Sequence, residues 1–478
     1  MAGRGDHQTT DPVLARALSR RHALRACLGA LVACPSVGAD PAQAEGMEVA
    51  RRLIEARLVE MGFVNLRRLQ SGDGQPAIHA ERLDAPGRPT LLVYAHYDVQ
   101  PPEPLSSWHS PPFAATERDG RLYGRGASDD KGPMLIALEA LAAFLEVEGR
   151  LPVNVKLLIE GEEETGSVSL PGLLAENREL LAADAVLSAD GARWRPDIVS
   201  LNTGSRGNSG FEIRVRTAGK DLHSGRYGGV VPNALHVMSR LVASLHDDQG
   251  RIAAPGFHDG VAGPSPTERQ QIAAIPVNMD AHLADIGTVP AGESGFSTLE
   301  RLWLRPALDV NGMWGGHTGA GAKTVIPCEA GAKITMRLVP GQTPEVARDA
   351  VLAHLHAQLP AGARLEVVED RGSCAAYAVP AAHPLLAAAE GALETTTGTR
   401  PRHVRIGASL PLTSIVAETL GLDTVMFSFA TSDEDFHAPN EFLRLDAIDE
   451  GLAAWIEILR RVGAQTPDTY APFRGRVS

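Results

Sequence analysis

The sequence predicts an α/β fold in which helices cover a mostly parallel sheet, with a smaller α+β domain inserted into the chain. Residues 90–99, TLLVYAHYDV, form a nearly continuous apolar run, as expected of a strand buried on both faces. Strand and helix patterns alternate through the first half, which is typical of parallel sheets. Near residue 207 the pattern changes to alternating, half-exposed strands. At 478 residues the chain is too long for one ordinary core, so two domains are expected.

Apolar spacing predicts each element of the first half. Helix patterns cover residues 47–63, which end near Gly62, and residues 132–147, which begin with Gly and Pro. Strand patterns cover residues 153–164, which run into a group of acids, and residues 183–191.

The middle of the chain predicts the inserted domain. Alternating strands are expected at 211–219, 332–340 and 363–369, and helices at 234–245 and 344–359. Residues of about 250–325 are rich in Gly and Pro and are expected to be irregular. The parallel pattern resumes at 383–393 and 424–429. We therefore expect one discontinuous domain of residues 1–207 and 379–478, and an insert of residues 208–378.

The amino-acid composition indicates which binding partners and which cellular compartment to expect. Apolar residues make up 44% and charged residues 22% of the chain, as in soluble globular proteins. The formal charge of −13 argues against nucleic acid or an anionic membrane as the main partner. The four cysteines form no CxxC pair and are too few for a disulfide scaffold. A reduced, cytoplasmic setting is therefore expected.

Residues 19–34 allow two interpretations. Basic residues precede an apolar run that ends in Cys34, which is similar to a secretory or lipoprotein signal. However, Arg25 interrupts the run, and Leu24, Leu28, Leu31 and Val32 recur at helical spacing. The second interpretation is an amphipathic helix of the folded domain. No stretch approaches about 18 uninterrupted apolar residues, so a membrane span is not expected.

His96 and Asp98 lie two positions apart at the C-terminal end of the first buried strand. Such residues share a face and can point into one pocket, and open α/β sheets place their sites at this end. An imidazole is a natural zinc ligand, and a nearby carboxylate can fix its tautomer. Taken alone, the pair is equally compatible with a surface contact.

Two further segments place acids beside the predicted pocket. In residues 122–133, LYGRGASDDKGP, Asp129 and Asp130 lie at a loop-to-helix junction, where a carboxylate can bridge two cations or cap the helix. In residues 159–167, IEGEEETGS, an apolar strand runs into Glu163, Glu164 and two other glutamates. Crowded like charges repel each other, and cations would remove that cost; the alternative is a solvated acidic turn.

Asp190 and His437 complete the pattern. Asp190 ends the strand at 185–190, and His437 follows the strand at 424–429. An acid or imidazole is then expected at the C-terminal end of each of five predicted strands. Mixed histidine and carboxylate ligands suit zinc, manganese or cobalt rather than copper or an iron–sulfur centre.

With these residues assembled, the chain resembles the M20 family of metallopeptidases, and within it the carnosinase-like and bacterial cytosolic dipeptidase branch. The resemblance extends from about residue 13 to residue 465 and rests on motifs in the family's order: AHYDVQP, YGRGASDDKGP, EGEEETGS, DLHSGRYGG, LDVNGMWGG, GAKTVIP, RLVP and HAPNE. It implies a metal-dependent hydrolase that cleaves the amide bond of a dipeptide or a similar small, carboxylate-bearing substrate. A homodimer is also implied.

The resemblance implies two divalent metal ions per chain. Zinc is the expected metal, and manganese and cobalt are the alternatives. Asp129 would bridge both ions. His96 and Asp190 would complete the site of one ion, and Glu164 and His437 that of the other. The discontinuous domain would then be the di-metal catalytic domain.

The resemblance also assigns the catalytic groups. Asp98 would orient His96, and Glu163 would be the general base that acts on a metal-bridging water. His223, in DLHSG, would come from the insert, a lid and dimerisation domain, often that of the partner subunit. It would stabilise the oxyanion.

Substrate contacts are implied in the insert and beyond it. Arg337 in RLVP and Thr324 in GAKTVIP would grip the substrate carboxylate, because a guanidinium presents a fork that matches a carboxylate. Ser409 would line the pocket. The weaker alternatives are that Arg337 is an ordinary surface residue of an alternating strand and that His223 is a loop histidine.

Three positions depart from the family pattern, and one of them is Ala438, which replaces a usual serine after His437. Ile406, in RIGASLP, replaces a glutamate that can meet the free amino group of a substrate, and an isoleucine cannot pair an ammonium. The substrate is then an N-acyl or N-carbamoyl amino acid without a free α-amine, or Glu434 or Asp435 substitutes for the missing acid. His317 stands beside the substrate region where relatives often have tyrosine.

Two other classes of function compete with the hydrolase. A phosphoesterase would need a cationic phosphate grip near the metals, and the sequence has no glycine-rich P-loop. A catalytically silent binding protein of the same fold would commonly have lost the base or a ligand, whereas Glu163 and all five expected ligands are present.

Overall fold

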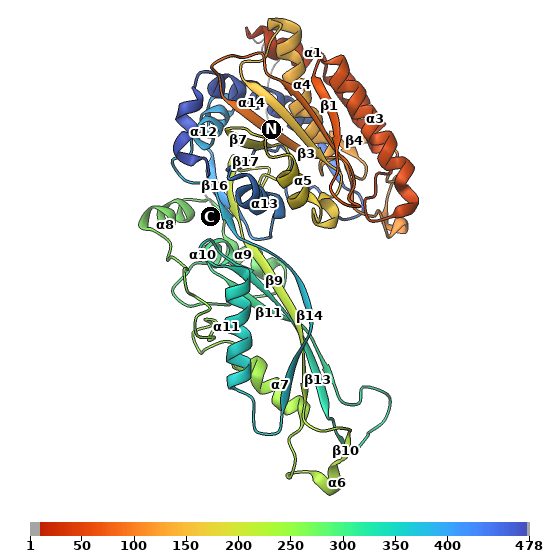
Figure 1. The fold of residues 1–478 in the computed structure, drawn as a ribbon, viewed down its shortest axis with the longest axis vertical. Coiled ribbons are helices and arrows are strands. Elements are labelled where there is room, and N and C mark those ends of the chain that lie inside the picture. The colour runs from red at the N-terminus through yellow and green to blue at the C-terminus, as the bar shows by residue number, and fades with distance from the viewer. Residues whose placement is uncertain (1–9, 476–478) are drawn as a thin grey trace. The chain divides into compact units, whose positions relative to one another are not determined.

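A computed structural model describes residues 10–475, and these form two compact units (Figure 1). Unit 1 comprises Met1–Thr203, Val379–Val404 and Ile415–Ser478. Unit 2 comprises Gly204–Ala378 and Arg405–Ser414. The chain passes between the units within three elements, β8 (Ser200–Ser205), β16 (Arg402–Ile406) and α13 (Pro411–Leu420), and directly after β15 (Tyr377–Ala378).

A six-stranded sheet forms the centre of unit 1. Its order is β1 (Val64–Leu69), β2 (Ala77–Arg82), β6 (Asn154–Glu160), β3 (Thr90–His96), β7 (Ala185–Ser188) and β17 (Thr424–Met426). Strands β6, β3, β7 and β17 run parallel, and β2 is antiparallel to both β1 and β6. The parallel strands are buried almost throughout, which explains their continuous apolar sequences. The mostly parallel sheet is therefore confirmed.

Helices cover this sheet, and smaller elements surround it. The helices are α1 (Pro12–Ser19), α2 (Arg21–Val32), α3 (Ala44–Glu60), α4 (Lys131–Glu148), α5 (Leu170–Glu176), α12 (Pro384–Thr397) and α14 (Leu445–Gly463). The smaller elements are the 3₁₀ helices η1 (Pro41–Gln43), η2 (Leu105–Ser107), η3 (Glu163–Thr165) and η4 (Pro467–Phe473), and a sheet of β18 (Phe442–Arg444), β5 (Arg121–Tyr123) and β4 (Thr116–Arg118). Helix α4 is apolar on all sides because it contacts β3 as well as α1, α2 and α14.

Helix α2 is the amphipathic helix that the sequence suggested. Leu24, Leu28, Leu31 and Val32 are its buried residues, and the helix packs on α4. The fully buried ammonium of Lys131 donates hydrogen bonds to the carbonyl oxygens of Leu31 (2.9 Å) and Cys34 (3.0 Å). The amphipathic interpretation is therefore confirmed. Across residues 10–475, no helix has both the length and the apolar character that a membrane crossing requires.

Unit 2 is built on a four-stranded antiparallel sheet. The strand order is β11 (Ala307–Gly315), β13 (Glu329–Leu338), β9 (Gly207–Arg216) and β14 (Arg364–Cys374). Helices α7 (Ala234–Ala243) and α11 (Pro344–Ala357) pack on one face, where every second strand residue joins an apolar cluster with them. The opposite face carries polar residues. Beyond one end lie the short pair β10 (Leu222–His223) and β12 (Val325–Ile326), and helix α6 (Ser224–Tyr227) (Figure 1).

The expectation of an irregular stretch at about 250–325 is wrong. It contains α8 (Pro266–Ala273), α9 (Met279–Asp285), α10 (Thr298–Leu304) and strand β11. Pro266 does not break α8; it occupies the first turn, and Ser265 and Glu268 form a capping box there. In β11 the pairing register shifts between Val310 and Gly312, so the glycine marks a bulge rather than the end of the strand.

The packing of α2 gives a stability prediction. Leu28→Ala should destabilise the protein by about 2–5 kcal/mol, since Leu28 is fully buried and truncation leaves a cavity. Cys27→Ala, at the neighbouring exposed position, should have almost no effect. Urea unfolding followed by circular dichroism measures both; equal stability of the two variants would contradict the packing role of α2.

Candidate metal centre

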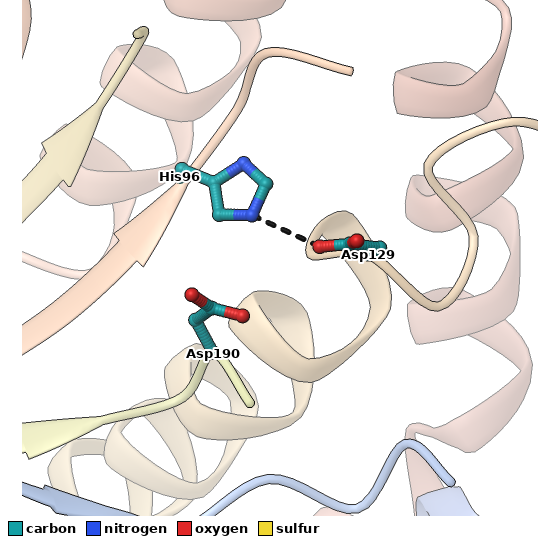
Figure 2. A group of neighbouring side chains, drawn as sticks. All are labelled: His96, Asp129 and Asp190. Atoms are coloured by element: carbon teal, nitrogen blue, oxygen red, sulfur yellow. Dashed lines mark hydrogen bonds and ion pairs between the residues drawn. The ribbon is translucent and has the colours of Figure 1, made fainter. Parts of the chain in front are cut away.

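Two groups of potential metal ligands share one carboxylate in unit 1. His96, Asp129 and Asp190 form one group, which Figure 2 shows, and Asp129, Glu164 and His437 form the other. In each group one ligand atom per residue lies within 4.8 Å of the others. Nε2 of His96 is 3.1 Å from Oδ1 of Asp129, and Nε2 of His437 is 3.1 Å from Oδ2. Asp129 therefore offers one oxygen to each group.

The five side chains come from the ends of three strands and from two loops. His96 is the last residue of β3, Glu164 lies in η3 after β6, and Asp190 follows β7 by two residues. Asp129 instead precedes α4, and His437 lies in a loop well beyond β17. The expectation that each of five strands ends in a ligand is therefore wrong for Asp129 and His437. Both come from irregular segments whose course depends on tertiary contacts.

Asp98 holds two parts of this centre in place. Its backbone carbonyl lies 3.1 Å from Nδ1 of His96, and its carboxylate lies 3.5 Å from the same nitrogen. The carboxylate also accepts hydrogen bonds from the backbone N–H groups of Glu163 (3.3 Å) and Glu164 (3.0 Å). Since His96 and Asp98 are fully buried, these contacts orient the ring so that Nε2 faces Asp129.

Two glycines allow the loop of Asp129 to fold tightly against α4. Gly126 has a φ of +82°, which side chains rarely adopt. A Cβ atom at Gly132 would lie 2.2 Å from the carbonyl oxygen of Ala127, so no larger residue fits. The peptide bond between Asp129 and Asp130 is cis. The glycines of this motif therefore set the position of the shared carboxylate.

Glu441 is a positioning group to which the sequence analysis gave no role. Its fully buried carboxylate accepts hydrogen bonds from the backbone N–H groups of Gly126 (2.9 Å), Ser128 (3.0 Å) and Asp129 (3.1 Å), and from Nη1 of Arg125 (2.6 Å). It thus fixes the backbone that carries the shared carboxylate. The available signal was its place in HAPNE, four residues after His437.

The ionisation of the centre is governed by crowding. Burial raises the pKa of Asp190 to about 6, with His96 opposing the shift. Burial also raises the pKa of Glu163 well above its usual range, and Asp190 and Asp129 add to the shift. Hydrogen bonds that the His437 ring donates to the carboxylates of Asp129 and Glu164 raise the pKa of His437 to about 10. For Asp129, burial opposes ionisation, but His437 and His96 hold the pKa well below its usual range.

These residues fit a pair of divalent cations. Neighbouring ligand atoms of a tetrahedral site with bonds of about 2.0–2.1 Å lie about 3.3 Å apart, close to the separations at Asp129. The donor set of imidazole nitrogens and carboxylate oxygens suits zinc, manganese or cobalt. His437 has a φ of +58°, a strained conformation that is characteristic of functional loops.

The substrate residues that the sequence suggested form two separate groups in unit 2. Nη1 of Arg337, near the end of β13, donates to Oγ of Ser409 at 2.9 Å. His223 pairs with Val325 between β10 and β12, beside Thr324, and His317 follows β11 at that same end. Arg337 lies eight residues along β13 from Glu329, which is roughly 27 Å at about 3.4 Å per residue. A single chain therefore does not bring His223, His317 or Thr324 to Arg337.

The two acids that could substitute for the missing glutamate have different surroundings. Glu434 is buried, and its carboxylate is held by Oγ of Ser128, the backbone N–H of Thr431 and the guanidinium of Arg444. The Glu434 carboxylate is therefore already engaged by neighbours within unit 1. Asp435 is exposed in the loop before His437. The backbone carbonyl of Ile406 accepts a hydrogen bond from the N–H of Arg206.

Comparison with known proteins gives the same assignment. Residues 92–461 match the model of peptidase family M20/M25/M40. The human Beta-Ala-His dipeptidase is 32% identical over 423 residues, covering 85% of this chain and 80% of the relative. The Cys-Gly metallodipeptidase DUG1 of Candida albicans is 29% identical and covers 86% and 89%. Among solved structures, the M20 family metallo-carboxypeptidase Sso-CP2 of Sulfolobus solfataricus superimposes with a TM-score of 0.78 at 29% identity, covering 92% and 99%.

The chain belongs to peptidase family M20/M25/M40, and it is a metal-dependent enzyme that hydrolyses peptide bonds. The family match spans most of unit 1 and all of unit 2, so it includes every residue of both metal-ligand groups.

The contacts of Glu441 predict its effect on metal binding. Glu441→Gln should weaken metal affinity by about tenfold to a hundredfold, because an amide cannot accept all of the hydrogen bonds that hold the Asp129 loop. A cobalt titration followed by absorbance measures this affinity, with Glu457→Gln on α14 as the control. The double variant Arg125→Met/Glu441→Gln removes the buried guanidinium as well. Wild-type affinity in both Glu441 variants would contradict the positioning role.

The raised pKa values predict proton release on metal binding. At pH 7.5 without metal, His437 is protonated because its pKa is about 10, and metal ligation must displace that proton. Below pH 6 Asp190 is protonated too, so the apparent metal affinity should fall more steeply with decreasing pH. Calorimetry in buffers of different ionisation enthalpy should detect release of at least about one proton at pH 7.5, and more at pH 5.5. An enthalpy independent of the buffer would contradict this protonation scheme.

Proposed function

We propose that this enzyme is a dipeptidase that uses two divalent metal ions, held by the two ligand groups around Asp129, and that the metal is zinc. The observation that carries the proposal is the sharing of one carboxylate between two histidine–carboxylate groups. His96 and Asp190 would hold one ion, and Glu164 and His437 the other. Manganese or cobalt suits the same donors. The relatives named as Beta-Ala-His dipeptidase and Cys-Gly metallodipeptidase support a small peptide as the substrate.

Glu163 is the group we assign to proton transfer. Two bound cations would polarise the scissile carbonyl and lower the pKa of the attacking water. The carboxylate of Glu163 takes the proton of the attacking water and delivers it to the leaving amide nitrogen. Its raised pKa, caused by burial and by the acids around it, suits a group that must hold a proton between these steps.

We propose that the active enzyme is a homodimer in which unit 2 serves as the lid and dimerisation domain. His223 and Thr324 lie at the opposite end of the unit 2 sheet from Arg337 and Ser409. One substrate can therefore meet both groups only if they come from two subunits. In that arrangement His223 of the partner stabilises the oxyanion, and Arg337 binds the substrate carboxylate.

The chain has no acid at the position expected to pair with the free amino group of a substrate. The segment RIGASLP contains no acid, Ile406 cannot pair an ammonium, and Glu434 is already engaged. N-acyl and N-carbamoyl amino acids are therefore a second substrate class that this observation favours.

We also propose that the enzyme is cytoplasmic, since all four cysteines are free thiols.

The role of Glu163 gives the test of this function. Glu163→Gln should lower kcat by about 10²–10⁴-fold, while metal content measured by mass spectrometry stays unchanged. Glu162→Gln is the matched control, since the neighbouring Glu162 carboxylate is engaged by the backbone N–H of Gln75 and by Ser169. The assay should compare free dipeptides with N-acyl and N-carbamoyl analogues under zinc, manganese and cobalt. Full turnover by Glu163→Gln would contradict the assignment.

A further inference from the structure

Unit 2 contains two arginines that share one loop and have no carboxylate partner. Nε of Arg206 donates to the carbonyl oxygen of Gly407 at 2.7 Å, and Nη1 of Arg337 donates to Oγ of Ser409 at 2.9 Å. The backbone N–H of Arg206 also bonds to this loop, at the carbonyl oxygens of Ile406 and Ala408. Among the side chains that the structure describes, neither guanidinium forms an ion pair.

Three other arginines of low exposure do have such a partner. Arg125 pairs with Glu441 at 2.6 Å, Arg305 with Glu293 at 2.7 Å, and Arg405 with Glu268 at 2.9 Å. Arg405 lies on the same segment as the shared loop. Burying a guanidinium without a counter-charge is costly, which is why these pairs exist. The unpaired state of Arg206 and Arg337 therefore indicates a ligand.

The charge around the two arginines remains positive. Burial lowers the pKa of Arg206 to about 10, with a further contribution from the charge of Arg337, and Asp309 is the acid that opposes the shift. Asp309 lies on the same face of the sheet as Arg337, because Ala307 pairs with Arg337 and Asp309 is two residues further along β11. The loop itself adds no acid, since residues 405–411 read RIGASLP.

We infer that Arg206 and Arg337 form a two-arginine anion site that selects substrates whose carboxylate half is aspartate or glutamate. One guanidinium binds the α-carboxylate and the other binds the side-chain carboxylate. The inference rests on the proposed function, in which Arg337 binds the substrate carboxylate, and it adds Arg206 as a specificity-determining residue. The terminal nitrogens of Arg206 remain available, because Nε alone bonds to the loop. A neutral end, such as glutamine, would leave one of these cations without a partner.

Steady-state kinetics on the metal-loaded, full-length enzyme tests this selection. The substrates are Ala-Glu and Ala-Asp, with Ala-Gln and Ala-Asn as the uncharged analogues of nearly the same shape. The acidic members should have kcat/KM values about tenfold to a hundredfold higher, the range of one hydrogen bond to a charged group. Arg206→Met should remove this ratio, and Arg206→Lys, which keeps the charge, should retain part of it.

The matched control is Arg405→Lys. Because Arg405 is already paired with Glu268, this substitution should leave the preference for acidic substrates unchanged. Equal kcat/KM for the acidic and amide substrates in the wild type would overturn the inference. An equal loss on all four substrates in Arg206→Met would also overturn it, because Arg206 would then only brace the loop. Calorimetric binding of glutamate against glutamine repeats the comparison without turnover. If the enzyme hydrolysed no dipeptide but still bound glutamate more tightly than glutamine, the proposed function would be rejected and the two-arginine anion site would stand.

Discussion

The electrostatic repulsion among buried carboxylates is the constraint on which the catalytic unit depends. Asp129, Glu163, Glu164 and Asp190 converge beside only two imidazoles, and burial raises the pKa of three of these acids. Without cations, protons must compensate for the excess negative charge. His437 then stays protonated at neutral pH, because its pKa is raised to about 10. A pair of divalent ions removes the same repulsion without protons. The acid-rich centre is therefore a favourable arrangement only in the metal-bound protein.

Such a centre needs rigid support, because ligands that repel each other move apart unless the backbone holds them. The support comes from two buried carboxylates that accept backbone N–H groups. Asp98 holds the N–H groups of Glu163 and Glu164, and Glu441 holds the loop of Asp129. His437 is kept in a positive-φ conformation that costs about 1–3 kcal/mol. The ligands are thus positioned by the fold before any ion arrives, which is a requirement for tight and selective metal binding.

The sequence predicts those parts of the structure that follow from local patterns. The parallel strands are continuous apolar runs, and His96 and Glu164 stand where two of these runs end, so both the sheet and much of the ligand set can be inferred. Glu441 could not, because its role is to accept backbone N–H groups from a loop more than three hundred residues earlier. The helices near residues 266–304 were missed because Pro266 starts a helix there rather than breaking one. Arg206 was missed because the absence of a counter-charge appears only when the neighbours are known.

The metal-ligand groups of unit 1 and the arginine pair of unit 2 carry opposite charge. The centre in unit 1 concentrates carboxylates and so attracts cations, whereas Arg337 on β13 and Arg206 just before β9 attract carboxylates. A peptide offers both features, a carbonyl oxygen that a cation polarises and a terminal carboxylate that a guanidinium binds. Within unit 2, the groups that we propose to bind substrate lie at two different ends of the sheet. A small peptide therefore offers a chemical partner to the carboxylate-rich centre and another to the arginine pair.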